Sequence, residues 1–146
     1  MWIILSLALG SPPPWTPSPD EAALLQVLSL RDGTPSCGEL VSMVPDPTTS
    51  LLHIVDNVTM PPWAPMRAAI CLIDKKEAEI EPQLREWVTQ PQKLGLAKLV
   101  LRRAHTLNPT RAKTLSELSL TSENRDTARQ ILSVSPDPIL RQLVKQ

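Results

Sequence analysis

The sequence contains no phenylalanine and no tyrosine, so four tryptophans supply all of its aromatic bulk. A core of leucine, isoleucine, valine and alanine favours closely packed helices over a sandwich of aromatic and β-branched strands. Only four glycines occur in 146 residues, which leaves little room for a phosphate-binding loop. The net charge is zero, with 15 basic and 15 acidic residues, and this excludes a global attraction to nucleic acid or acidic membranes. The missing residue types therefore indicate a helical protein with no nucleotide-binding loop.

The sequence also lacks the common catalytic motifs. It has no G-x-S-x-G and no H-E-x-x-H, and its two histidines, His53 and His105, have no nucleophile and acid in a recognisable arrangement around them. Several acidic residues gather near the middle of the chain, where lysine and arginine lie among them, which is typical of a solvated turn. These are Asp74, Glu77, Glu79, Glu81 and Glu86. We therefore predict that the protein is not an enzyme and uses no cofactor and no metal.

The two cysteines, Cys37 and Cys71, are 34 residues apart and do not have Cys-x-x-Cys spacing. Together with the two isolated histidines they give no pairing of ligands for a structural zinc. We interpret them as small buried apolar residues. A disulfide is the alternative if the chain is exported to an oxidising compartment.

The chain begins with an apolar run that ends in small residues. Ala8 and Gly10 occupy the −3 and −1 positions of a cleavage after Gly10, so we read residues 1–10 as a short or truncated export signal. No basic residue precedes the run, and the alternative is an apolar N-terminus on a cytoplasmic protein. Nine apolar residues are too few to span a bilayer as a helix. Residues 11–18, with four prolines, are expected to form a stiff leader.

From residue 18 onward, prolines mark helix starts, where the missing N–H costs nothing. Ser18 and Glu21 fit a capping box around Pro19, and Gly33 fits a left-handed helix stop. No stretch alternates convincingly enough to be a strand. The pattern predicts helices at 19–31, 36–44, 47–58, 62–75, 80–89, 92–105, 109–119, 122–134 and 137–145.

An internal repeat of about 30 residues runs from residue 62 to the end. One alanine and two larger residues recur with i, i+3, i+4 spacing in alternate helices, and the intervening helices also match one another. The first set is Ala69, Leu72, Ile73; Ala97, Val100, Leu101; and Ala128, Ile131, Leu132. The second is Leu84, Trp87; Ala112, Leu115; and Leu140, Leu143. A single helix pair cannot bury its own apolar face, so the pairs are expected to stack.

These residues carry a resemblance to a known class. The run Pro61-Pro62-Trp63-Ala64-Pro65-Met66-Arg67-Ala68-Ala69-Ile70-Cys71-Leu72 resembles the first helix of a HEAT repeat, and residues 82–88 are similar to the second helix. The resemblance covers residues 62–146 and, more weakly, 19–58. It implies an all-α fold in which short antiparallel helix pairs stack as a HEAT-like α-solenoid, with residues 19–146 as a single domain. Such arrays are mostly binding scaffolds, and the family brings no catalytic residues.

One segment, 93–113, contains basic residues and no acidic ones. Its members are Lys93, Lys98, Arg102, Arg103, Arg111 and Lys113. These side chains are candidates for contact with a phosphate, an acidic lipid or an acidic protein surface. The alternative is a solvated face balanced by the acidic turn that precedes it. No aromatics lie between the basic residues, so stacking on bases is unsupported.

The leading functional hypothesis is a non-catalytic interaction module, exported to the periplasm or beyond the cell, whose partner is another protein. A second is binding of an anionic polymer or membrane surface through residues 93–113, although nucleic acid is an unlikely ligand. A third is a lyase-type helical-repeat enzyme, which would need a reactive Cys71 beside a concave pocket. No small-molecule substrate is indicated.

Overall fold

The computed structural model describes residues 14–146, and within that range every regular element is a helix. The α-helices are α1 (Pro19–Leu28), α2 (Cys37–Ser42), α3 (Pro47–Asn57), α4 (Trp63–Lys75), α5 (Glu81–Thr89), α6 (Leu94–Arg103), α7 (Pro109–Leu120), α8 (Arg125–Leu132) and α9 (Pro138–Leu143). Two short 3₁₀ helices, η1 (Pro91–Lys93) and η2 (Ala104–Thr106), flank α6. The prediction of an all-α protein is confirmed for this range. The expected signal at 1–10 and the first three residues of the leader at 11–18 lie outside the described residues.

The helix starts follow the predicted chemistry. The Ser18 hydroxyl accepts the Glu21 N–H at 3.2 Å, and the Glu21 carboxylate accepts the Ser18 N–H at 2.9 Å, which completes the capping box of α1. Ser36 accepts the Glu39 N–H in the same way at α2, and Asp46 caps α3 in front of its proline. Each cap satisfies N–H groups that have no partner inside the helix.

Several helix bounds differ from the prediction by up to three residues, and two of these differences have a structural cause. Helix α1 ends at Leu28, with Ser29 as its C-cap, so Gly33 does not terminate it. Gly33 instead adopts φ of 71° in the loop that leads to α2, a conformation that glycine takes at little cost. The expected helix at 92–105 is divided, because the backbone tightens into 3₁₀ turns at both ends of α6.

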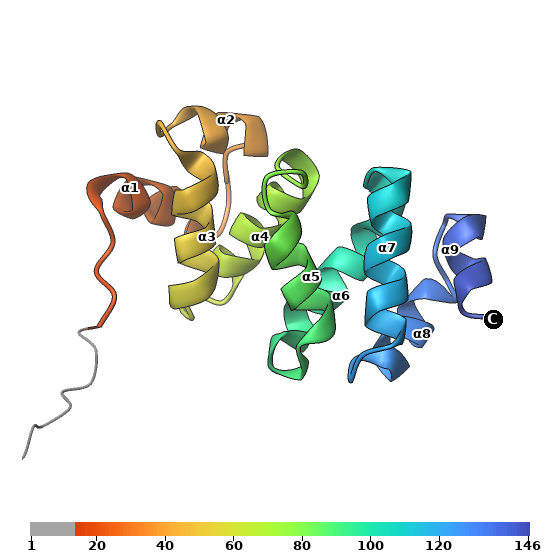
Figure 1. Ribbon diagram of the computed structural model, residues 1–146. Helices are drawn as coiled ribbons and strands as arrows, with labels where there is room; N and C mark the ends of the chain where they lie inside the picture. Colours follow the sequence, from red (N-terminus) through yellow and green to blue (C-terminus); the bar gives the residue numbers. More distant parts are fainter. Residues whose placement is uncertain (1–13) are drawn as a thin grey trace, which may run out of the picture.

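The helices follow one another in chain order from one end of the molecule to the other (Figure 1). Beyond α3, alternate helices pack on each other, so that α4, α6 and α8 form one row and α5, α7 and α9 form a second. Among helices that are neighbours in sequence, the most extensive packing joins α3 to α4, α5 to α6 and α7 to α8. No helix in residues 14–146 is both long and apolar enough to cross a membrane.

From α4 onward the core lies between these two rows, and the same cluster of buried residues continues into α1, α2 and α3. Of the residues assigned to the repeated inner faces, all are buried except Ile131, which is partly exposed. Trp87 on α5 is the largest fully buried side chain. Alanines at the first position of each set allow the helices of one row to approach closely, and the aliphatic side chains one turn later fill the space that remains.

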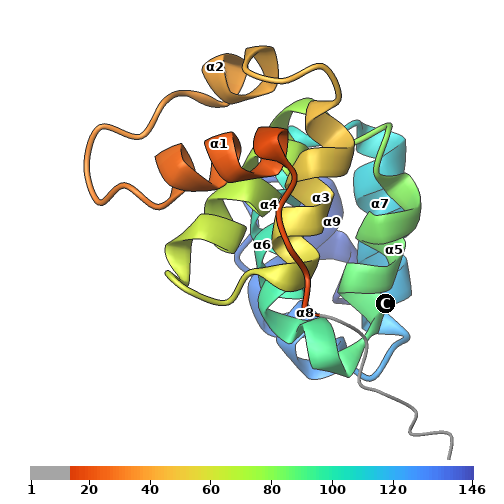
Figure 2. The ribbon, with the colours of Figure 1, turned by 90° about the vertical axis from the view of Figure 1, so that its left-hand side faces the viewer.

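At the N-terminal end, α1 lies across α3 and α2 sits at the outer edge (Figure 2). The carbonyl groups at the end of α1 are bound by side chains of α4. Trp63 Nε1 donates to the Ser29 carbonyl at 3.1 Å, and the Arg67 guanidinium donates to the carbonyls of Leu28, Leu30 and Arg31. Carbonyls at a helix end otherwise lack partners, so Arg67 of the Arg-Ala-Ala motif fastens α1 to α4.

Side chains of α7 and of the residue just before α8 donate hydrogen bonds to the carbonyl groups at the end of α5. The Val88 carbonyl accepts hydrogen bonds from Ser119 Oγ of α7 at 2.9 Å and from Asn124 Nδ2, just before α8, at 3.1 Å. Asn124 Nδ2 also donates to the Gln90 carbonyl at 3.1 Å. Ser119 and Asn124 are both buried. Buried polar groups at this seam therefore bind one another and fix the position of α7 and α8 against α5.

The described part of the leader, residues 14–18, has no regular structure. It is not free of the domain, because Trp15 is partly buried against the hydrophobic core. The tryptophan therefore anchors residues 14–18 to the helices.

Candidate interaction surface

The six basic candidates are distributed over η1, α6 and α7, and the structure binds four of them to acidic side chains. Arg103 forms two parallel hydrogen bonds with Asp74, from Nε to Oδ1 at 2.9 Å and from the guanidinium to Oδ2 at 3.0 Å. This hydrogen bonding raises the pKa of Arg103 above its ordinary value. The pair joins α6 to α4, two helices of the same row.

Two of the other three basic candidates also pair with residues of the acidic turn. Arg111 lies 2.9 Å from Glu77 and 3.7 Å from Glu81, and the Lys93 ammonium lies 2.8 Å from Glu86. Lys113 faces Glu117 of its own helix at 3.9 Å, with both side chains more than half exposed. Ion pairs at exposed positions contribute little stability, but here they cancel much of the charge of the basic segment.

Lys98 and Arg102 are the two basic candidates that the structure does not pair with an acidic side chain. They lie four residues apart on α6, and neither forms an ion pair with any other residue in 14–146. Two positive charges on one helix turn make a smaller surface than the six-residue patch that the sequence suggests. A broad anionic surface would therefore meet two unpaired charges here and four that are already paired.

A groove of about 640 Å³ lies where α3, α4, α5 and α6 meet, a volume in the usual range of binding sites. Most of its walls are apolar. The apolar residues are Val55, Val58, Pro65, Met66, Trp87 and Leu96. Met66 is 39% exposed, one of the large apolar side chains of residues 14–146 left open to solvent.

The polar residues of the groove are Asp56, Gln83, Gln92 and the Glu86–Lys93 pair. Asp56 is exposed and makes no hydrogen bond or ion pair through its carboxylate with any residue in 14–146. The Oε1 atom of Gln83 is buried and also has no partner. Sequence reasoning did not find this site, because its residues come from four helices and no spacing in the chain relates them.

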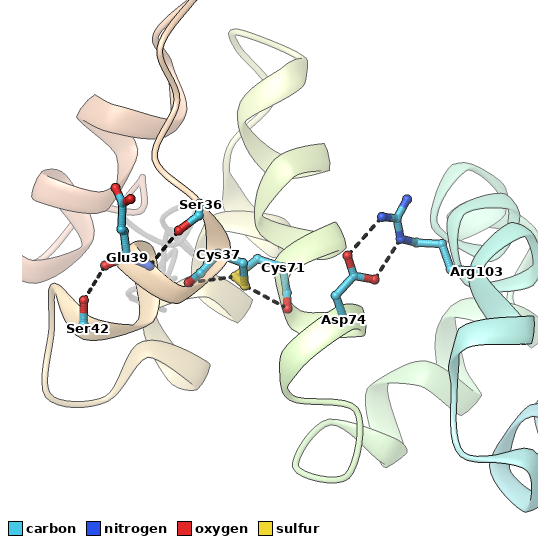
Figure 3. Close-up of a disulfide and its surroundings, with 7 residues drawn as sticks. All are labelled: Ser36, Cys37, Glu39, Ser42, Cys71, Asp74 and Arg103. Carbon is cyan, nitrogen blue, oxygen red and sulfur yellow. Dashed lines mark hydrogen bonds and ion pairs between the residues drawn. A yellow bond between two sulfur atoms is a disulfide. The ribbon is translucent and has the colours of Figure 1, made fainter.

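The two cysteines are bonded, which corrects our interpretation of them as separate apolar residues. Cys37 of α2 and Cys71 of α4 form a disulfide, with their Cα atoms 5.2 Å apart (Figure 3). Cys71 is 2% exposed. A cysteine in a disulfide presents no thiolate, so neither residue is available as the nucleophile that the lyase hypothesis requires. Stacking of the helices brings the pair together, and nothing in their spacing predicts it.

Figure 3 also shows the Asp74–Arg103 ion pair, which lies close to the disulfide on α4. Asp74 lies about one turn after Cys71 on the same helix, so α4 is bonded to α2 at one residue and paired to α6 at the next turn. A cavity of about 260 Å³ lies beside the disulfide, lined by residues of the α1–α2 loop, α2 and α4.

His53 on α3 is about half exposed and contacts a buried carboxylate of α1. Its Nδ1 atom lies 2.7 Å from Oε2 of Glu21, which is buried at 5% exposure. Burial alone raises the pKa of Glu21, but hydrogen bonds from Ser18 and His53 outweigh it, and the pKa lies below its ordinary value. The pair joins α1 to α3, 32 residues apart in the chain. No group of three or more metal-ligating side chains occurs within residues 14–146.

No protein family model matches this chain, and neither the curated proteins nor the solved structures include a significant match.

Proposed function

We propose that this chain is a non-catalytic, HEAT-like helical-repeat scaffold that binds another protein through one face of its helix stack. The observation that carries this function is the order of the helix contacts, with α4, α6 and α8 packed in one row and α5, α7 and α9 in another. Two parallel rows of short helices are the arrangement of an α-solenoid, whose extended surfaces serve as binding platforms.

The polar contacts between layers support a repeated arrangement. Asp74 and Arg103 are 29 residues apart, Val88 and Ser119 are 31 apart, and Glu77 and Arg111 are 34 apart. These separations are close to the repeat of about 30 residues, so each contact joins one helix pair to the next. A stack fastened in this way offers a fixed surface, which reduces the ordering cost of binding.

The disulfide supports placing this scaffold in an oxidising compartment, either the cell envelope or the exterior. Disulfides persist in such compartments and are rare where thiols are kept reduced. The apolar run at residues 1–10, with its small residues before a cleavage point, agrees with export. A cytoplasmic location would require this bond to be transient.

Binding of an anionic polymer or membrane is the weaker function, because four of the six basic candidates are already paired with carboxylates. It would depend on Lys98 and Arg102. A lyase reaction at Cys71 would first require reduction of the disulfide.

The test is the footprint of a natural partner on the full-length protein. We would capture partners from an extract of the source cell, purify the complex, and compare amide hydrogen exchange of the free and bound chain. Protection should cover helices from at least two consecutive layers on one side of the stack. Lack of any stoichiometric partner, or protection limited to residues 14–18, would overturn the scaffold function.

A further inference from the structure

We infer, on the basis of the scaffold function proposed above, that the groove between α3, α4, α5 and α6 binds an extended segment of the partner protein. In that segment a lysine or arginine stands next to an aliphatic side chain. Three features of the groove lead to this occupant: open space beside a helix backbone, a buried acceptor without a donor, and an unpaired negative charge among apolar walls.

The open space lies at Gly95, in the first turn of α6. A Cβ atom built at Gly95 meets no atom within 4 Å, so close packing of the helices does not require glycine here. Its φ is not in the left-handed region, so conformational freedom does not require it either. Glycine in a helix is less stable than alanine. The residue instead leaves room for another molecule to approach the backbone of α6 from the groove.

The buried acceptor is Oε1 of Gln83 on α5, which no donor in residues 14–146 reaches. Most buried polar atoms in native proteins have a partner. This oxygen has less than 1 Å² of exposed surface, so the partly exposed Gln83 side chain must rotate toward the groove on binding. An extended segment carries free backbone N–H groups that can donate to the rotated amide, whereas the N–H groups of a helix beyond its first turn are already bonded. An extended occupant therefore fits this feature better than a helical one.

The charge of the groove selects the side chains of that segment. Asp56 is unpaired, while Glu86 and Lys93 neutralise each other at 2.8 Å, so the groove carries a net charge of one negative unit. A lysine or arginine complements Asp56 and also competes for Glu86. Next to it, Val55, Val58 and Leu96 present an aliphatic surface, and Met66 adapts its shape to the side chain that it meets.

The experiment is selection of a random dodecapeptide library on the full-length, disulfide-bonded protein, followed by Kd measurements on synthetic peptides by fluorescence anisotropy. Enriched peptides should share a basic residue beside an aliphatic one. Gly95→Leu, which fills the groove, should raise Kd at least about tenfold, and Asp56→Asn should raise it about threefold and weaken its salt dependence.

The matched controls are a helical glycine and an exposed aspartate outside the groove. Gly38→Leu on α2, where an added Cβ meets only Ser36 Oγ at 3.8 Å, and Asp126→Asn on α8 should both leave Kd within about twofold. If Gly95→Leu loses its helical circular dichroism, Met66→Arg takes its place, because it adds a like charge to that of the peptide at an exposed position.

Three results would overturn the inference: no enriched peptide, enrichment of acidic peptides, or equal binding by Gly95→Leu and Gly38→Leu. Different results would refute the groove inference and the scaffold function. A natural partner whose footprint avoids the groove would refute this inference and leave the scaffold function intact, whereas the absence of any partner would refute the scaffold function.

Discussion

Helices α1–α4, here the N-terminal region, and helices α5–α9, the C-terminal region, are joined internally by different kinds of interaction. The N-terminal region has a covalent bond between α2 and α4, an arginine and a tryptophan that bind the carbonyls at the end of α1, and an ion pair between α1 and α3. The C-terminal region has no disulfide and relies mainly on regular packing of its two rows, with an ion pair between Arg111 of α7 and Glu81 of α5 and a buried serine and asparagine at one seam.

The difference follows from the regularity of the sequence. Where the alanine and aliphatic positions recur every 30 residues or so, each layer buries the face of the one before it, and packing alone holds the layers. Helices α1 and α2 do not follow that pattern, and α2 has six residues with Leu40 as its one buried side chain. A short helix with so little apolar contact is marginal in water, so a disulfide compensates for the missing packing.

The largest effect is expected for Ala97→Glu, which attacks the packing of the C-terminal region. Ala97 is fully buried on α6, and a carboxylate there has no partner in the seam. We expect a loss of about 4 kcal/mol or more in the free energy of unfolding. Thermal denaturation followed by circular dichroism measures it, with Arg102→Glu on the exposed side of the same helix as the control. An unchanged melting temperature would mean that this face of α6 is wrongly placed.

The second effect concerns the N-terminal region alone. Replacing both cysteines, as Cys37→Ala with Cys71→Ala, opens a loop of 34 residues and is expected to cost about 3–4 kcal/mol. Amide hydrogen exchange should show faster exchange in α1–α4 and little change in α5–α9. Equal acceleration throughout the chain would show that the two regions unfold as one unit.

The third effect lies at the seam of the C-terminal region. Asn124→Leu keeps the approximate side-chain volume but removes both hydrogen bonds to the end of α5. We expect a cost of roughly 2 kcal/mol, because two hydrogen bonds are lost, while the Val88 carbonyl keeps the Ser119 hydroxyl as a donor and the Gln90 carbonyl keeps the Lys93 N–H. Urea denaturation measures it, with the exposed Gln130→Leu on α8 as the control. If Asn124→Leu and Gln130→Leu unfold at the same urea concentration, the hydrogen bonds of Asn124 do not contribute to the free energy of unfolding.

The smallest effect depends on pH and belongs to the N-terminal region. The pKa of Glu21 in the folded protein lies below its ordinary value of 4.5. The ionised carboxylate therefore stabilises the fold at pH values above the unfolded pKa, and this contribution disappears as the pH falls through the folded pKa. Glu21→Gln should be less stable than wild type at pH 7, on the order of 1 kcal/mol.

The difference between Glu21→Gln and wild type should vanish near pH 3, and urea denaturation at the two pH values measures it. The exposed Glu123→Gln serves as the control, since Glu123 makes no ion pair in residues 14–146. If the difference in unfolding free energy between Glu21→Gln and wild type is the same at pH 3 and pH 7, the charge of the Glu21 carboxylate does not stabilise the fold.

Much of the fold could be predicted from the sequence, because helix starts are local. Proline after serine or aspartate sets the first turn of α1 and α3 within a few residues, and the i, i+3, i+4 spacing identifies faces that are buried in the structure. The helix ends were less predictable, since α1 ends where Trp63 and Arg67 bind its carbonyls and not at Gly33. Spacing also does not reveal which neighbour a helix packs on most extensively, and α4 packs on α3 more than on α5.

The candidate site was less predictable than the fold. The basic segment was visible as a run of charge, but its pairing with Asp74, Glu77 and Glu86 depends on how the layers stack. The acidic turn does provide most of the partners, as one reading of the sequence suggested. The groove and the disulfide combine residues from distant parts of the chain, and the order of residues in a single sequence contains no signal that joins them.

Helix α4 has a mechanical consequence for a scaffold that is pulled by its partners. Tension applied at the C-terminal end passes through the stack to α4 across the Asp74–Arg103 contact and the packing of α4 on α6. Beyond that point, the load meets a covalent link to α2. Because noncovalent contacts yield at lower force than a sulfur–sulfur bond, the helices that follow Cys71 would separate first, while the disulfide keeps Cys37 of α2 attached to Cys71 of α4.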